Sequence, residues 1–208
     1  MAIKCVDLIS ENPLAWKKAT RHPFLDECRS GTIKTNQFNT WLVQDYLFVI
    51  EFTRMAARLV TIAPVKHMDI LLGGLSALKD ELNWFREKAT ERSLNLTSAR
   101  QESCELYCLF LNDLKEYTYA VQSVAFWAIE LAYNQAWQLP GPMVQPYNEY
   151  ADRWGNQAFT EYVKMLELQA NEALIEIDPE TEKQLKKVFL KIADFEKDFW
   201  QMAYLDNS

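Results

Sequence analysis

Residues 38–59, FNTWLVQDYLFVIEFTRMAARL, place one aspartate in the middle of an apolar helix face. Apolar residues recur at positions 38, 41, 42, 48, 49, 52, 55, 56 and 59, which is the three-and-four spacing of a helix with one buried side. At about 100° per residue, Asp45 falls within this stripe. Because an unpaired carboxylate in a protein core costs several kcal/mol, the pattern predicts that Asp45 has a use there.

Length and composition favour one folded domain over residues 1–208. Hydrophobic residues make up 49% of the chain and charged residues 25%, which argues against disorder. Only 5 glycines and 7 prolines punctuate the sequence, and alternating β-branched stretches are missing, so we expect an all-α helical bundle.

Charge and cysteine content limit the partners and the compartment. The net charge of −7 gives the chain no electrostatic reason to bind nucleic acid or an anionic membrane. The N-terminus lacks an uninterrupted apolar core and no run is long enough to span a bilayer, so we expect neither a signal peptide nor a membrane helix. The four cysteines show no disulfide framework, which predicts a reducing, cytoplasmic location.

Prolines and apolar periodicity set the expected helix limits. Asn12 and Pro13 are typical of a helix start, with asparagine at the N-cap and proline at the first helical position. Helices are expected after Asn12-Pro13 and His22-Pro23, then over about 35–63, 65–92, 98–114, 117–139, 145–153, 156–174 and 179–204.

Each of the other three long helices also carries an acid within its apolar stripe. Glu81 shares a face with Leu78 and Trp84, Glu130 with Phe126 and Tyr133, and Glu196 with Ile192 and Trp200. The pattern therefore predicts four inward-facing carboxylates, one from each long helix.

Four inward acids are also typical of a carboxylate di-metal site, but that site requires Glu-x-x-His on two helices. Here the third residue after each glutamate is Trp84, Tyr133 or Phe199, and both histidines of the chain lie elsewhere. Acids flanked by aromatic rings instead favour a small, planar, nitrogen-rich ligand. In the structural alternative, the acids pair with buried Arg, Lys or Tyr and only hold the bundle in register.

Carboxylic acids among Trp and Phe side chains are expected to have raised pKa values, as a general acid near neutral pH requires. Two acids in one pocket push their pKa values apart, which supplies a proton donor and a proton acceptor. Such a pair suits expulsion of an amine or hydrolysis of an amide bond without a cofactor or a metal.

Five motifs resemble the TenA (thiaminase II) family, whose fold is that of the haem oxygenase-like helical bundles. They are QDYLF (44–48), DExxWF (80–85), AFWAIE (125–130), RWGN (153–156) and ExxFWxMA (196–203). The resemblance covers nearly the whole chain. It implies hydrolytic salvage of thiamin-derived aminopyrimidines to 4-amino-5-hydroxymethyl-2-methylpyrimidine or its amine precursor.

The resemblance also implies residue roles. Asp45 would hold the amino group and a ring nitrogen of the pyrimidine, and Glu196 would protonate the departing amine. Phe48 occupies the place where many members carry a tyrosine at the ligand. Trp84 and Glu130 are further residues expected to line the substrate site.

The chain departs from the best-known branch of the family at position 125. That branch carries a nucleophilic cysteine where this sequence has Ala125, so the pattern resembles the TenA-E branch, which is associated with aminopyrimidine hydrolysis and removal of an N-formyl group. Water activated by Glu81, with Glu130 as the alternative, is expected to replace the thiolate. Cys104 and Cys108 offer thiols on a neighbouring helix, but their apolar surroundings favour small buried hydrophobes.

Trp154 and Asn156 have two interpretations. An asparagine can donate to and accept from a pyrimidine edge, so both residues are candidates for the substrate site. Alternatively, Asn156 is the N-cap of the following helix.

Three functions compete at this point. The first is a metal-independent C–N hydrolase acting on aminopyrimidines, and the second is a pyrimidine-binding or regulatory protein without catalysis. The third is a relative of the helical metallo-oxygenases, against which the histidine count argues. We expect a homodimer or homotetramer with isologous contacts, as in the family.

Overall fold

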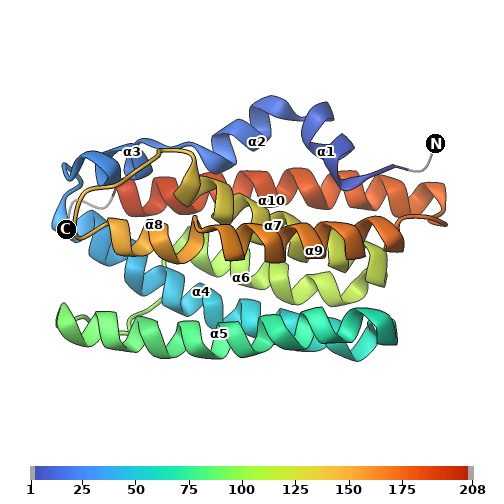
Figure 1. The fold of residues 1–208 in the computed structure, drawn as a ribbon, viewed down its shortest axis with the longest axis horizontal. Coiled ribbons are helices and arrows are strands. Elements are labelled where there is room, and N and C mark those ends of the chain that lie inside the picture. The colour runs from blue at the N-terminus through green and yellow to red at the C-terminus, as the bar shows by residue number, and fades with distance from the viewer. Residues whose placement is uncertain (1–2, 206–208) are drawn as a thin grey trace. The chain divides into compact units, whose positions relative to one another are not determined.

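The protein is built of helices (Figure 1), and they form two compact units. The computed structural model describes residues 3–205, none of which forms a β-strand. The first unit combines residues up to 33 with residues 118–201, and the second combines residues 34–117 with residues from 202 onward. The prediction of an all-α chain is confirmed. One domain over residues 1–208 stays a prediction.

The helices follow one another in the order that the apolar periodicity predicted. In residues 3–205 they are α1 (Cys5–Glu11), α2 (Pro13–Thr20), α3 (Pro23–Ser30), α4 (Thr35–Ile62), α5 (Val65–Glu91), α6 (Glu102–Asp113), the 3-10 turn η1 (Leu114–Glu116), α7 (Tyr119–Gln138), α8 (Asn148–Trp154), α9 (Gln157–Ala173) and α10 (Pro179–Leu205). None of these helices combines the length and apolar character that crossing a bilayer requires.

The predicted helix limits agree best with the structure where a proline is present. Pro13, Pro23 and Pro179 are the first residues of α2, α3 and α10, and α4 ends before Pro64. Two expectations were wrong in detail. Helix α1 was not expected, and α6 begins at Glu102 rather than near residue 98.

Side-chain hydrogen bonds explain the late start of α6. Asn95 Oδ1 accepts from both the backbone N–H and the hydroxyl of Thr97, at 2.9 and 2.7 Å. The hydroxyl of Ser98 donates to the carbonyl of Asn95 at 2.9 Å. Such local bonds compete with the helix, so the segment before α6 forms a turn.

In the second unit, α4 packs against α5 and α6. Arg92 donates to Asn39 Oδ1 at 3.0 Å and the ring of Phe85 lies 6.3 Å from that of Tyr46, so α5 runs antiparallel to α4. Helix α6 runs parallel to α4. Gln44 of α4 contacts Gln101 just before α6, and four residues further along α4 the ring of Phe48 lies 4.7 Å from that of Tyr107 within α6.

In the first unit, α7 lies against α9, and the two are antiparallel. Gln169 Nε2 donates to Tyr119 Oη at 2.7 Å near one end, and Thr160 Oγ1 donates to Asn134 Oδ1 at 3.2 Å near the other. Helix α10 reverses direction after α9 and therefore runs parallel to α7 (Figure 1).

The N-terminal helices belong to the same unit and are tied to it by polar contacts. The backbone N–H of Cys5 donates to Asn171 Oδ1 at 2.8 Å, and Trp16 Nε1 donates to Gln135 Oε1 at 2.9 Å. Helices α1 and α2 are thus attached to α9 and α7, respectively.

Gly155, between α8 and α9, lies where two stretches of backbone approach closely. A Cβ atom at this position would lie 2.8 Å from the carbonyl oxygen of Ala151 and 3.1 Å from that of Trp137. Both contacts are with backbone atoms, which cannot rotate away as a side chain can. The close approach of α7 and α8 in the first unit therefore requires glycine here.

Gly155→Ala is expected to lower the free energy of unfolding by about 1–3 kcal/mol, because the backbone must shift to admit the methyl group. Gly73, which is exposed within α5 and has nothing within 4 Å of its Cβ position, is the matched control. Gly73→Ala should raise the stability by up to about 1 kcal/mol through helix propensity. Urea unfolding of both variants measures the difference, and equal stability of Gly155→Ala and wild type would contradict the packing argument.

Candidate active site

Asp45 lies in the core of the second unit, with 2% of its surface exposed. The apolar residues of the same helix face, including Trp41, Leu42 and Val49, are buried with it. The prediction that the aspartate points inward is thus confirmed. Its carboxylate is close enough to α6 to be among the charges that raise the pKa of Cys104, after the hydrogen bond with Cys108 and burial.

Two of the other three acids are buried as expected, and one is not. Glu130 on α7 and Glu196 on α10 are 8% and 5% exposed, respectively. Glu81 on α5 is only half-buried, although it lies on the stripe that contains Leu78 and Phe85. The periodicity located the correct helix face, but α5 packs chiefly against α4 in its unit, so a residue at the margin of that face keeps contact with solvent.

Phe48 is held in place by aromatic contacts within the second unit. Its ring stacks on Phe52 of the same helix at 5.8 Å and lies tilted against Tyr107 of α6 at 4.7 Å. Phe48 follows Asp45 by three residues, so one helical turn presents a carboxylate and a fixed aromatic face side by side.

Glu81 and Trp84 lie further along the α4–α5 pair than Asp45. The antiparallel contacts Arg92–Asn39 and Phe85–Tyr46 place Glu81 level with about residue 50 of α4, roughly 7 Å along the helix axis from Asp45. Trp84 is half-buried, meets the edge of Phe85 at 5.3 Å and lies 5.9 Å from Lys88 Nζ. Along the helix axis, Glu81 is thus more than one turn away from Asp45.

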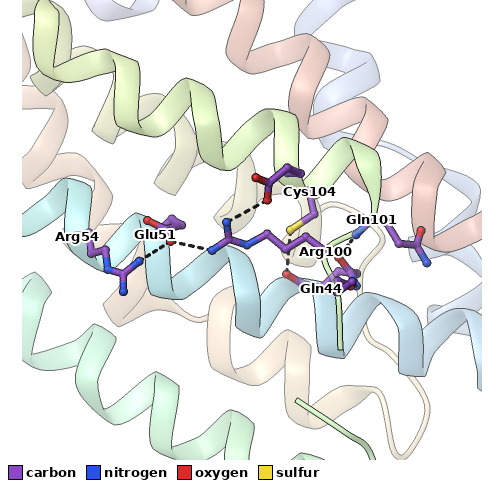
Figure 2. A network of polar contacts seen from close by, with 8 residues as sticks. Gln44, Glu51, Arg54, Arg100, Gln101 and Cys104 are labelled. Carbon is purple, nitrogen blue, oxygen red and sulfur yellow. Dashed lines mark hydrogen bonds and ion pairs between the residues drawn. The ribbon is translucent and has the colours of Figure 1, made fainter. Parts of the chain in front are cut away.

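Gln44, beside Asp45, is a buried polar residue that sequence reasoning missed (Figure 2). Its Oε1 accepts from the backbone N–H of Gln101 at 2.8 Å, and its Nε2 donates to the carbonyl of Ala99 at 3.1 Å. The side chain therefore fixes the segment leading into α6. Position 44 is three residues after Trp41 and four before Phe48, so the spacing that identified Asp45 also applied to Gln44.

An arginine–glutamate network extends from this segment (Figure 2). Arg100 donates to Glu51 at 2.7 Å and to Glu105 at 3.1 Å, and Glu51 also pairs with Arg54 at 2.5 Å. Burial alone would lower the pKa of Arg100, but the hydrogen bonds to Glu51 and Glu105 outweigh it and raise that pKa. The network ties α6 to α4 within the second unit.

A cavity of about 380 Å³ opens next to this segment in the second unit. Its lining is rich in amides and hydroxyls, contributed by Asn36, Asn39, Gln44, Asn95 and Ser98. None of the eight residues predicted for the substrate site lines it.

Glu130 and Glu196 lie at corresponding levels of two parallel helices in the first unit. The ring of Tyr133 stacks on Trp200 at 6.0 Å with an interplanar angle of 17°, which brings α7 and α10 together. Glu130 precedes Tyr133 by three residues, and Glu196 precedes Trp200 by four. Each acid therefore lies about one helical turn before the Tyr133–Trp200 contact and on the same helix face as the ring that makes this contact.

Trp154 is buried in an aromatic cluster of the first unit, with its ring 5.2 Å from Tyr133 and 5.5 Å from Trp137. Its carbonyl accepts a hydrogen bond from Asn134 Nδ2 at 2.7 Å. Asn134 is a further buried polar residue that the sequence pattern did not single out. Through its contacts with Trp154 and Thr160, it joins α7 to the end of α8 and the start of α9.

Asn156 has the capping role that sequence analysis left open. Its Oδ1 accepts from the backbone N–H of Phe159 at 2.8 Å, and its Nδ2 donates to the carbonyls of Asp152 and Arg153, each at 2.8 Å. Both amide hydrogens are thus engaged by the corner between α8 and α9. A contact of Asn156 with substrate stays a prediction.

Trp127 supplies a buried donor that the sequence analysis did not single out. Its side chain is 1% exposed, and its indole N–H meets no acceptor among residues 3–205. Tryptophan N–H groups usually find a partner when they are buried, and that tendency was the available signal.

The four cysteines are buried and free. Cys104 Sγ donates to the carbonyl of Gln44 at 3.5 Å, and its contact with Cys108 together with burial raises its pKa well above the usual range. A thiol with a raised pKa is a poor nucleophile near neutral pH. The interpretation of Cys104 and Cys108 as small buried hydrophobes fits this environment.

Position 125, where the resemblance places the family cysteine, holds a fully buried alanine on α7. Within residues 3–205, no three His, Cys, Asp or Glu side chains are grouped closely enough to share a metal ion.

A sequence profile of the TENA/THI-4/PQQC family matches residues 10–206. The chain belongs to this family. The resemblance carried by the five motifs is thereby confirmed.

Similar proteins occur in plants, bacteria and archaea. A Glycine max protein named "Probable bifunctional TENA-E protein" is 34% identical over 94% of this chain and 90% of its own length. The "Aminopyrimidine aminohydrolase" of Helicobacter pylori is 27% identical over 91% of this chain and 93% of its own. The crystal structure of a TenA homologue from Pyrococcus furiosus superimposes with a TM-score of 0.91 at 30% identity, covering 96% of this chain and 98% of that one.

A TENA/THI-4/PQQC protein with these thiol environments should show no fast-reacting cysteine. We expect the native protein to react negligibly with 5,5′-dithiobis(2-nitrobenzoate) near neutral pH, because all four thiols are buried and the pKa values of Cys5 and Cys104 are raised. Four thiols should become reactive in denaturant, and this serves as the control. If a thiol of the native protein reacted as fast as an unhindered thiol, Cys104 or Cys108 would again be a candidate nucleophile.

Proposed function

We propose that this TENA/THI-4/PQQC protein is a thiamin-salvage hydrolase that cleaves a C–N bond of aminopyrimidines without a metal or a cofactor. The proposed product is 4-amino-5-hydroxymethyl-2-methylpyrimidine, or the amine precursor where an N-formyl group is removed. The names of the Helicobacter pylori and Glycine max relatives support the substrate class.

The observation that carries the proposal is the burial of Glu130 and Glu196 at the same level of two parallel helices. Two carboxyl groups in one apolar environment favour a state in which one holds a proton and the other does not. General acid–base catalysis of C–N cleavage requires such a division of roles.

In the proposed reaction, Glu196 gives its proton to the departing nitrogen as the C–N bond breaks, so the amine leaves as a neutral molecule. A second carboxylate takes a proton from water, whose oxygen forms the new bond to carbon. Glu81 and Glu130 are the two candidates for this base. The burial of Glu130 and its register with Glu196 support Glu130, whereas Glu81 is half-buried.

Asp45 and Phe48 are assigned to binding. The carboxylate of Asp45 would accept from the amino group of the pyrimidine and interact with a ring nitrogen, while the fixed ring of Phe48 offers a face for stacking. Trp84, Trp154 and Asn156 are carried over from the family resemblance as further substrate-site residues. For Asn156 the engaged amide hydrogens favour a positioning role.

A pyrimidine-binding protein without catalysis is the second candidate, and Ala125 at the cysteine position favours it. Incubation of the pure protein with aminomethyl and formylaminomethyl pyrimidines separates the two functions. The hydrolase forms hydroxymethylpyrimidine, the aminopyrimidine or formate, whereas a binding protein retains the substrate unchanged. A dimeric or tetrameric state and a cytoplasmic location stay predictions.

Glu196→Gln should lower kcat by about 100-fold or more, because the amide cannot donate a proton to the leaving nitrogen. KM should change little, since Glu196 is assigned to the chemical step and not to binding. Glu180→Gln, at an exposed position of the same helix, is the matched control and should retain wild-type turnover. Circular dichroism verifies folding, and full activity of folded Glu196→Gln would remove this residue from the mechanism.

Asp45→Asn should weaken binding of the product pyrimidine by about tenfold or more, because a charge-assisted hydrogen bond is replaced by a neutral one of similar size. Isothermal titration calorimetry with the hydroxymethylpyrimidine measures this affinity directly. Asp69→Asn, at an exposed position on α5, controls for the loss of one negative charge. An unchanged dissociation constant for Asp45→Asn would show that the pyrimidine is held elsewhere.

A further inference from the structure

A second cavity, of about 260 Å³, lies in the first unit where α2 gives way to α3. Charged and polar side chains dominate its lining, with Arg21, His22, Asp26 and Arg29 around the apolar Leu25. It contains none of the residues assigned to the pyrimidine.

Arg21 and Arg29 differ from the other arginines of the chain. In residues 3–205 neither guanidinium takes part in a hydrogen bond or an ion pair with protein. The other six all have such a contact or lie over an aromatic ring; they are Arg54, Arg58, Arg86, Arg92, Arg100 and Arg153. Both of these arginines are exposed to solvent, and both line the same small cavity.

The neighbouring polar groups are already engaged in holding α3. His22 Nδ1 accepts from the backbone N–H of Phe24 at 3.1 Å, so the neutral ring carries its proton on Nε2, 3.2 Å from Gln201 Oε1. Burial lowers the pKa of His22, which keeps the ring neutral near neutral pH. The next two backbone N–H groups, of Leu25 and Asp26, both bond to the carbonyl of His22.

Charge within the cavity therefore comes from three side chains. Arg21 and Arg29 are positive and Asp26 is negative, which leaves one net positive charge in a chain whose overall charge is −7. A local excess of this sign recruits an anion, and guanidinium groups match the oxygen geometry of a phosphate through paired N–H donors.

We propose that this cavity binds a small phosphate, either free or as the phosphomonoester of a small molecule. Its volume corresponds to about nine water molecules at roughly 30 Å³ each, which accommodates a phosphoryl group with a short substituent. It is smaller than the roughly 300–1,000 Å³ of pockets for drug-sized ligands, which favours a small phosphate over a whole nucleotide. Both guanidinium groups can pair with oxygens of one phosphate, whereas a carboxylate would use only one of them.

Isothermal titration calorimetry at constant ionic strength tests this site with inorganic phosphate, phenyl phosphate and acetate as probes. Both phosphates should bind more tightly than acetate. Tighter binding of phenyl phosphate than of inorganic phosphate would identify a phosphomonoester as the ligand, and the reverse order would identify free phosphate. The proposal would be overturned if acetate bound as tightly as either phosphate, or if both phosphates had dissociation constants above about 10 mM. A dissociation constant of about 10 mM corresponds to only about −2.7 kcal/mol of binding free energy.

Three variants locate the binding. Arg21→Gln combined with Arg29→Gln should weaken phosphate binding by at least about tenfold, because the charge-assisted donors are lost. Asp26→Asn should strengthen it by about threefold, because a like charge is removed from the cavity. Lys17→Gln combined with Lys18→Gln removes the same charge from exposed positions of α2 outside the cavity.

The lysine pair should leave phosphate affinity within about twofold of wild type, since these exposed charges do not line the cavity and are screened by salt. An equal loss of affinity in the lysine and arginine pairs would show that phosphate responds only to the general positive field. Aminopyrimidine turnover is measured separately on the same variants and should remain at the wild-type level. Phosphate binding and the proposed hydrolysis can therefore fail independently.

Discussion

Three carboxylates, those of Asp45, Glu130 and Glu196, are removed from water on helix faces that are largely apolar. Taking a charged group out of water costs several kcal/mol unless its surroundings compensate. The surrounding faces carry the largest side chains of the protein, among them Trp41, Trp127 and Trp200, whose burial supplies the opposing hydrophobic free energy. The orientation of each helix must be fixed for this balance to persist, because a small rotation of the helix about its axis would move a carboxylate from an aromatic neighbour toward solvent.

Side-chain amides, two of them buried and that of Asn156 half-buried, provide much of that positional control. Gln44, Asn134 and Asn156 each bind backbone groups of a connecting segment, and each uses both donor and acceptor. An amide suits this task because it satisfies a free carbonyl and a free N–H at a helix end without introducing charge. These three amides thus hold joints between helices, whereas the buried carboxylates lie on the faces between them.

Sequence periodicity was sufficient to place the buried acids on the correct faces, because it reports which side of a helix faces the core. It was not sufficient for Glu81, whose exposure depends on how much of α5 is covered by other helices. Prolines at 13, 23 and 179 fixed helix starts through their rigid φ, whereas the start of α6 moved to Glu102 because Asn95 and its neighbours form competing side-chain bonds. The cavity with Arg21 and Arg29 depends on contact between two segments far apart in the sequence, residues 20–29 and 139–140, and this contact leaves no spacing signal in the sequence.

The discontinuous composition of the two units orders events during synthesis. Helices α1 to α3 leave the ribosome first, but α7 and α9 come much later, as the Trp16–Gln135 and Cys5–Asn171 contacts illustrate with separations of 119 and 166 residues. At about 5–20 residues per second, the early helices wait roughly 6–33 s before those partners exist. Helices α4 to α6, which pack on one another, can associate during that interval. The middle of the chain is therefore positioned to fold before its beginning, and the N-terminal amphipathic helices are the segment that must remain protected from aggregation until α9 has been made.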